Sequence, residues 1–145
     1  MKLFKLYVVI GFILVIIGII FDFGFVRTPD KFVETVENSH NAWQNYVYNL
    51  MRFYLIILGL LNITFGLFLR HLEKTAKLRW IVFYVLNGGG IILFLGLILA
   101  AQFRPGAFEG FTGSVPYYLE VIGILAIIAS IIIEVSQIIR KEAIE

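Results

Sequence analysis

Four long apolar runs constrain the fold of this chain more than any other feature of its sequence. They cover residues 6–26, 46–69, 79–103 and 116–139, and each is near the roughly 20 residues that a helix needs to cross about 30 Å of hydrocarbon. The chain is 60% hydrophobic and only 15% charged, so a soluble domain of this size has nowhere to bury its apolar surface. Backbone groups cannot stay unpaired in lipid, and the runs lack the alternation of barrel strands. The sequence therefore predicts an all-α integral membrane protein in which residues 1–145 form one four-transmembrane-helix bundle.

Basic residues flank mostly one side of this predicted topology. They are Lys2, Lys5, Arg70, Lys74, Lys77, Arg79, Arg140 and Lys141. By the positive-inside rule that side is cytoplasmic. We therefore predict that both termini are cytoplasmic, that loops 27–45 and 104–115 are outside, and that the membrane is the plasma membrane of a prokaryote. The start also resembles a signal peptide, but no small-x-small cleavage pair follows, so we expect it to be kept as the first span.

The first outer loop has the pattern of a short amphipathic helix. Thr28 suits an N-cap and Pro29 the first helical position. Four residues then recur every three or four positions: Phe32, Val36, His40 and Trp43. We expect this helix to lie on the outer membrane surface, and the alternative is a solvated connector that packs on the end of the bundle.

The residues present exclude several kinds of chemistry. The chain has no cysteine, which excludes disulfides, thiolate catalysis and the dithiol redox chemistry of small four-helix quinone-linked oxidases. His40 falls in the outer loop and His71 in the inner turn, so the two cannot jointly hold a haem or a metal. Asn87-Gly-Gly-Gly90 is not a phosphate-binding fingerprint, because no strand precedes it. We predict no cofactor, no metal site and no nucleic-acid partner.

Three charged residues inside the predicted spans form the first candidate site. Asp22, Arg52 and Glu120 each lie near the outer end of a span, on a face predicted to point inward. A charge near the bilayer centre costs about 2.5–3.5 kcal/mol, and less toward the interface, so we predict that the three cluster. In one interpretation Arg52 clamps two carboxylates and fixes helix register. In another the cluster is an outer vestibule that binds a cation, a proton or a polar headgroup, and in a third a side chain snorkels to the surface.

Three further polar residues lie within the spans. Asn62 and Asn87 are equally far from the midpoint of the inner turn, so they lie at one depth and are predicted to hydrogen-bond across the hairpin. Glu134, near the inner end of the fourth span, is predicted to meet a basic residue at the inner surface rather than to carry protons. The candidate basic partners are Arg70, Lys77 and Arg79.

Small residues mark faces suited to close helix contact. Gly11 and Gly18 share one face of the first span with Asp22. The triple glycine that ends at Gly90 predicts a close helix crossing, with a kink or a ligand contact as alternatives. In the fourth span, polar and small residues form a heptad seam at Glu120, Gly123, Ile127, Ser130 and Glu134.

The sequence contains a weak sign of internal duplication. The first and third runs each end in an arginine followed shortly by a proline, Arg27-Thr-Pro29 and Arg104-Pro105. Two matched dipeptides are also expected by chance, so they do not establish a repeat.

These features favour a non-catalytic membrane protein that acts by association with a membrane partner or with itself, in contact with membrane lipid. The alternative is an oligomeric transporter or channel that uses Asp22, Arg52 and Glu120 as its polar site. A less favoured hypothesis is a lipid-modifying membrane enzyme with an outer carboxylate as general acid.

Overall fold

The computed structural model describes residues 2–21, 39–68, 76–102 and 115–142 of the chain. Except for the turn at Ala101 and Gln102, every described residue is helical. The described residues form the helices α1 (Lys2–Phe21), α3 (Ser39–Phe68), α4 (Ala76–Ala100) and α6 (Val115–Glu142). Each contains a stretch long and apolar enough to cross a membrane, namely Leu3–Phe21, Trp43–Phe68, Leu78–Ala100 and Val115–Ser136. The predicted all-helical architecture with four such helices is thus confirmed.

The helix ends on the side predicted to be outer differ from the prediction. α3 begins at Ser39 rather than near residue 46 and runs without a break, so His40 and Trp43 belong to α3 and not to a separate loop helix. The rest of that predicted loop helix lies outside the described residues. α4 ends at Ala100, a little before the predicted end. α6 begins at Val115, and Pro116 sits in its first turn, where the missing N–H breaks no intrahelical bond.

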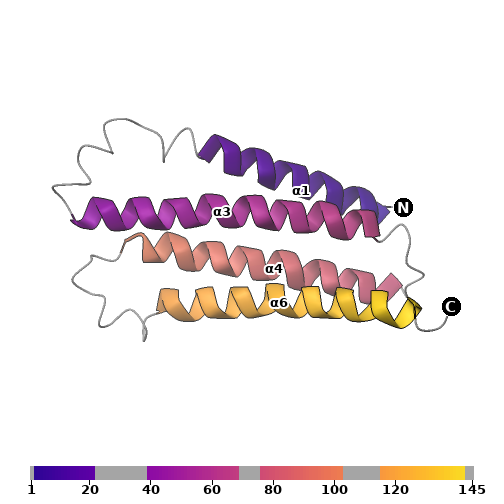
Figure 1. The fold of residues 1–145 in the computed structure, drawn as a ribbon. Coiled ribbons are helices and arrows are strands. Elements are labelled where there is room, and N and C mark those ends of the chain that lie inside the picture. The colour runs from indigo at the N-terminus through magenta and orange to yellow at the C-terminus, as the bar shows by residue number, and fades with distance from the viewer. Residues whose placement is uncertain (1, 22–38, 69–75, 103–114, 143–145) are drawn as a thin grey trace.

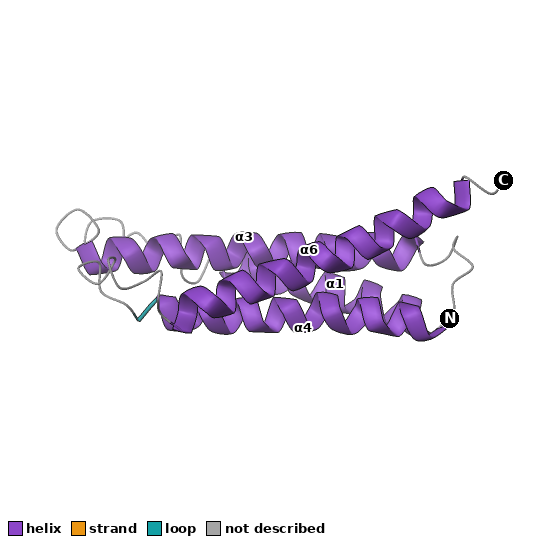
Figure 2. Cartoon of the chain, turned by 90° about the horizontal axis from the view of Figure 1, so that it is seen from below, coloured by secondary structure: helices purple, strands orange, loops and turns teal. Residues whose placement is uncertain are grey.

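The helices pair as two antiparallel hairpins. α1 packs along α3, and α4 packs along α6, whereas α3 and α4 contact each other far less. Figure 1 shows the four helices side by side in chain order, with the start of α1 and the end of α6 at the same end of the bundle. Seen from below, α6 runs obliquely to α4 (Figure 2). We call the interface between the two hairpins the hairpin seam.

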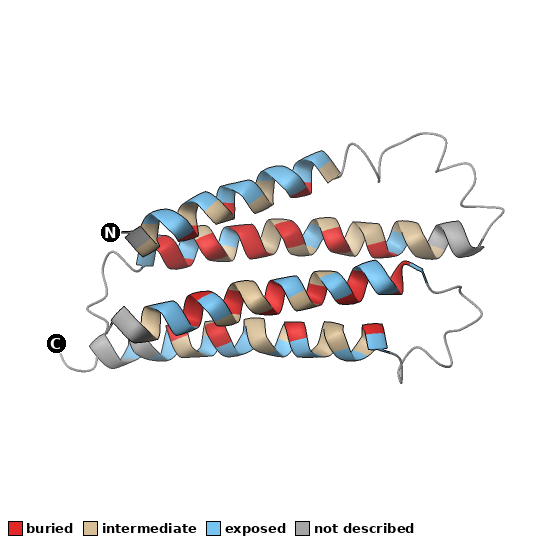
Figure 3. Cartoon of the chain, turned by 180° about the vertical axis from the view of Figure 1, so that it is seen from behind, coloured by how far each residue is buried: buried red, intermediate tan, exposed pale blue. Residues whose placement is uncertain are grey.

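The two middle helices are the more buried ones. Within the apolar stretches, 39% of α3 and 44% of α4 is buried, against 17% of α1 and of α6. Figure 3 shows buried positions concentrated along α3 and α4, while much of α1 and α6 is exposed. The exposed side chains of α1 and α6 are mostly large and apolar, as expected for helices whose outer face meets lipid.

Glycines allow α1 and α3 to pack backbone to backbone. A Cβ atom added at Gly11 would lie 2.6 Å from the carbonyl oxygen of Gly59, and one added at Gly59 would lie 2.7 Å from that of Gly11. Further along the hairpin, a Cβ on Gly18 would lie 2.8 Å from the Ile56 side chain and 3.4 Å from the Arg52 carbonyl oxygen. No side chain fits at Gly11 or Gly59 without separating the helices, whereas at Gly18 the Ile56 side chain would have to shift.

The second hairpin repeats this crossing. A Cβ on Gly89 would lie 3.0 Å from the carbonyl oxygen of Gly123, and one on Gly123 would lie 2.8 Å from that of Gly89. Seven residues after Gly89, a Cβ on Gly96 would lie 2.9 Å from the Glu120 side chain and 3.0 Å from the Pro116 carbonyl oxygen. Gly89 and Gly96 therefore stand in α4 as Gly11 and Gly18 stand in α1.

The repeated contacts match a repeated sequence. Around its crossing glycine, α3 reads Tyr54-Leu55, Gly59, Leu61 and Ile63, and α6 reads Tyr118-Leu119, Gly123, Leu125 and Ile127 at identical spacing. The two hairpins are thus one structural unit used twice, in the same orientation. The glycine contacts therefore recur at the same spacing in both hairpins, a similarity that the two matched dipeptides do not show.

Candidate functional site

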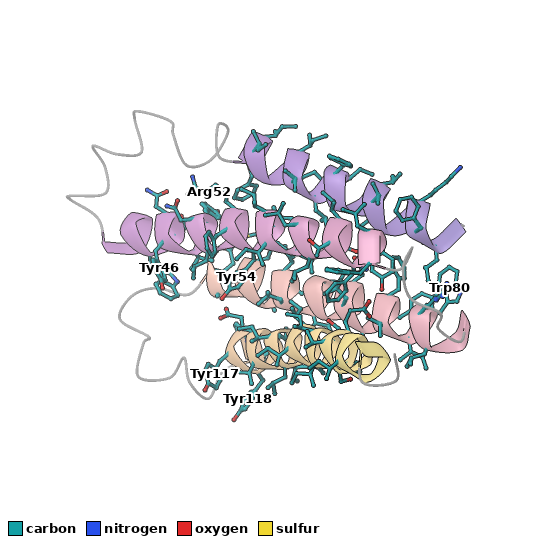
Figure 4. All side chains as sticks on the ribbon, turned by 45° about the vertical axis from the view of Figure 1, so that its right-hand side comes forward. Tyr46, Arg52, Tyr54, Trp80, Tyr117 and Tyr118 are labelled. Atoms are coloured by element: carbon teal, nitrogen blue, oxygen red, sulfur yellow. The ribbon has the colours of Figure 1, made fainter. Side chains whose placement is uncertain are left out.

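Of the three charged residues in the predicted outer cluster, the structure describes Arg52 and Glu120 and shows no bond between them. Asp22 lies outside the described residues. Arg52 lies on the side of α3 that faces α1, whereas Tyr54 lies on the other side, toward α4 and α6 (Figure 4). Glu120 lies on α6 against Gly96 of α4, and no hydrogen bond or ion pair connects it to Arg52 in the part of the chain that the structure describes. The cluster of three therefore stays a prediction.

The Glu120 side chain packs against a glycine of α4, Gly96. Its Cγ and its backbone nitrogen both lie 2.9 Å from the position that a Cβ on Gly96 would occupy. Only a glycine at 96 leaves room for the Glu120 stem between α4 and α6. The side chain is half-buried, which leaves part of it accessible near the start of α6.

The predicted pair of amides meets in the hairpin seam. Asn87 of α4 donates a hydrogen bond from Nδ2 to Oδ1 of Asn62 of α3 at 3.1 Å. The same nitrogen lies 3.0 Å from the Phe83 carbonyl oxygen, and Nδ2 of Asn62 donates to the Leu58 carbonyl oxygen at 2.9 Å. Both amides are thus bonded to their own helix as well as to each other, and Asn62 is fully buried.

Glu134 is buried in α6, and its pairing with a basic residue at the inner surface stays a prediction. Only 3% of the residue is exposed. Of its predicted partners, Arg70 lies outside the described residues, the Lys77 side chain is not described, and Arg79 is half-buried. One turn before it, buried Ser130 donates from Oγ to the Ile127 carbonyl oxygen at 2.7 Å.

Tyr7 is the residue that sequence reasoning missed. Its ring packs edge-on against Phe65 of α3 and Phe83 of α4, with centroid separations of 6.5 and 4.8 Å. One side chain of α1 therefore contacts both α3 and α4. In the sequence it is one more aromatic residue near the start of an apolar run, which gives no signal of this role.

A second polar contact joins the hairpins at the end of the bundle that is predicted to be outer. The indole Nε1 of Trp43 donates to the carbonyl oxygen of Ala100 at 2.8 Å. This carbonyl belongs to the last turn of α4, where no intrahelical donor remains for it. The bond therefore satisfies the end of α4 and ties it to the start of α3.

The three consecutive glycines of α4 have three different surroundings. Gly89 meets α6, and Gly90 meets the flexible end of the Leu58 side chain of α3. Gly88 has nothing within 4 Å of the position of an added Cβ. Tyr84 lies one turn and Trp80 two turns before it on the same face. Their rings stack with centroids 5.6 Å apart, and 64% of Tyr84 is exposed. The helix continues through all three glycines.

Among the described residues, no group of three or more His, Asp or Glu side chains could hold a metal ion. No protein-family model matches the chain, and comparisons with curated proteins and with solved structures give no significant match.

Proposed function

We propose that this chain is an integral protein of a prokaryotic plasma membrane, with both termini cytoplasmic, and that it acts by associating with another membrane protein or with itself rather than by catalysis. The four apolar helices and the one-sided basic residues support the membrane topology. The observation that carries the association is the open surface at Gly88.

Most of the described glycines make a contact that Gly88 lacks. Of the nine described glycines, seven have a backbone atom of another helix within 3.5 Å of an added Cβ, Gly90 meets the Leu58 side chain, and Gly88 has nothing within 4 Å. Glycine costs up to about 1 kcal/mol relative to alanine in a helix, and it allows close contact between helix backbones. We infer that Gly88 marks a place where a helix from outside the monomer can come equally close.

The surroundings of Gly88 suit such a contact. The stacked pair Trp80 and Tyr84 forms an exposed aromatic wall on one side, and exposed Ile91 lies on the other. Aromatic side chains supply large contact area at low entropic cost, and they are enriched in protein interfaces. We call this surface of α4, formed by Trp80, Tyr84, Gly88 and Ile91, the α4 contact face.

Replacement of Gly88 by isoleucine tests the contact. The absence of native cysteine allows one cysteine at position 145 to carry a donor or an acceptor dye. We expect energy transfer between labelled copies in phospholipid vesicles that falls when unlabelled protein is added. In Gly88→Ile the association is expected to be about tenfold weaker, equivalent to about 1.4 kcal/mol, because the branched side chain holds the helices apart.

A matched control and a second readout complete this test. Ala129→Ile adds the same side chain to the exposed face of α6 and should leave association unchanged. For a partner other than a second copy, a photo-reactive residue at position 84 should give a cross-linked product in native membranes that Gly88→Ile loses. The absence of both energy transfer and cross-linking in the wild type would contradict the proposal.

A transporter or channel is the second candidate function, because the hairpin seam lies between two parallel repeats. Transporters built from such repeats place their substrate sites at the repeat interface, and here that interface includes the amide pair Asn62 and Asn87. This function requires ion or solute flux through the reconstituted wild-type chain, and its absence would contradict it.

A further inference from the structure

An apolar groove lies between α3 and α6, where the two hairpins are not in close contact. It has a volume of about 130 Å³ and is half open to the surroundings. Its lining recurs at helical spacing on both helices, Tyr54, Ile57, Leu58 and Leu61 from α3 and Ile124, Ile127, Ile128 and Ile131 from α6. Tyr54 points to this side of α3 (Figure 4).

We infer that this groove binds one acyl chain of a membrane phospholipid, which fills the hairpin seam between α3 and α6. The inference depends on the proposed membrane location and not on the α4 contact face. Three properties of the groove identify its occupant.

The depth of the groove selects hydrocarbon over headgroup. The lining residues lie in the middle of the apolar stretches Trp43–Phe68 and Val115–Ser136. In a bilayer this level is occupied by lipid tails, and water does not enter to fill a void. The lining is almost wholly apolar, so it offers the occupant dispersion contacts and no polar group to bind beyond the Tyr54 hydroxyl.

The size of the groove excludes a helix. An α-helix with its side chains is about 10–12 Å across and rises about 5.4 Å per turn, so a single turn occupies about 400 Å³. This is several times the groove volume of about 130 Å³. An engineered cavity of about 150 Å³ in another protein takes up benzene, so this groove suits a short length of a thin hydrocarbon chain.

The shape of the lining also argues against a helix. The close crossings within each hairpin use glycine, and close approach of helices in membranes generally needs small residues. The groove is lined by isoleucine, leucine and tyrosine without one glycine, alanine or serine. A flexible acyl chain fits between large side chains where a helix backbone does not.

The wild-type chain tests the inference without any substitution. Reconstituted in vesicles with a phosphatidylcholine that carries a photo-reactive diazirine in its acyl chain, the protein should be labelled preferentially at residues 54–61 and 124–131. Labelling spread evenly over the exposed faces, including that of α1, would overturn the assignment, because it indicates ordinary annular lipid.

Filling the groove gives the second test. Native mass spectrometry in a mild detergent should show one retained phospholipid on the wild type and several-fold less on Ile57→Phe/Ile128→Phe. Ile132→Phe is the matched control, since it makes the same change one turn further along α6, outside the groove. Equal phospholipid retention in the filled variant and the control would overturn the inference. So would a dimer that only the filled variant loses, because the occupant is then a second copy.

Discussion

Gly88, Gly89 and Gly90 have three different surroundings, because successive residues point in different directions around the helix axis. Gly89 accommodates α6, Gly90 faces the Leu58 side chain and Gly88 faces open space. The sequence indicated a close crossing at this triplet but not which glycine makes it. Helical periodicity fixes relative directions along one helix and leaves the absolute rotation of that helix to tertiary packing.

Alanine substitutions at 88 and 89 separate these roles. Gly89→Ala should lower the free energy of unfolding by about 1–3 kcal/mol, because its Cβ would lie 2.7 Å from that of Ala126 and would overpack the crossing. Gly88→Ala should be neutral or stabilising by up to about 1 kcal/mol through helix propensity. Thermal unfolding of both variants in one detergent measures the difference. Equal losses of stability would contradict the structure at this crossing.

The rotation of each helix about its axis also explains which of the other predicted residues meet in the structure. Equal distance from the inner turn placed Asn62 and Asn87 at one depth, and their shared direction then allows the 3.1 Å hydrogen bond. Arg52 and Glu120 also lie near one end of the bundle, but Arg52 faces α1 and Glu120 packs on α4. Depth can be read from a sequence by counting. The side toward which a residue points depends on which helices are neighbours.

At the scale of elements, the existence of four helices was predictable and their pairing was not. Runs of 20 or more apolar residues leave a helix as the only backbone arrangement without unpaired polar groups. The glycines of α1, α3, α4 and α6 offer several complementary pairings, and the sequence alone does not choose among them. The start of α3 was missed because the amphipathic spacing of His40 and Trp43 continues directly into the apolar run.

The hairpin seam should depend on its amide pair. A double-mutant cycle with Asn62→Leu and Asn87→Leu is expected to give a coupling energy of about 0.6 kcal/mol, the average for hydrogen bonds between membrane helices. Reversible unfolding in mixed micelles measures it. In the control cycle Asn49→Leu replaces Asn62→Leu, since Asn49 bonds only to the Asn45 carbonyl of its own helix among the bonds described. Coupling no larger than in the control would show that the pair does not stabilise the seam.

At the scale of the whole molecule, two similar hairpins lie in parallel, each fastened by glycine crossings. Between them are the Asn62–Asn87 and Trp43–Ala100 bonds, the Tyr7 ring and the groove between α3 and α6. Contacts are close within each hairpin and sparse between the hairpins. This arrangement places the start of α1 and the end of α6 together at one end of the bundle (Figure 1).

The most direct test of this architecture is its topology in the membrane. In the cysteine-free chain, Thr75→Cys and Ser114→Cys place one thiol in each of two loops predicted to lie on opposite sides. A membrane-impermeant maleimide added to intact cells should label Ser114→Cys at once and Thr75→Cys only after lysis. The reason is that the basic segment 70–79 is predicted to stay in the cytoplasm. Labelling of both from outside would contradict four crossings, and the reverse pattern would contradict the predicted orientation.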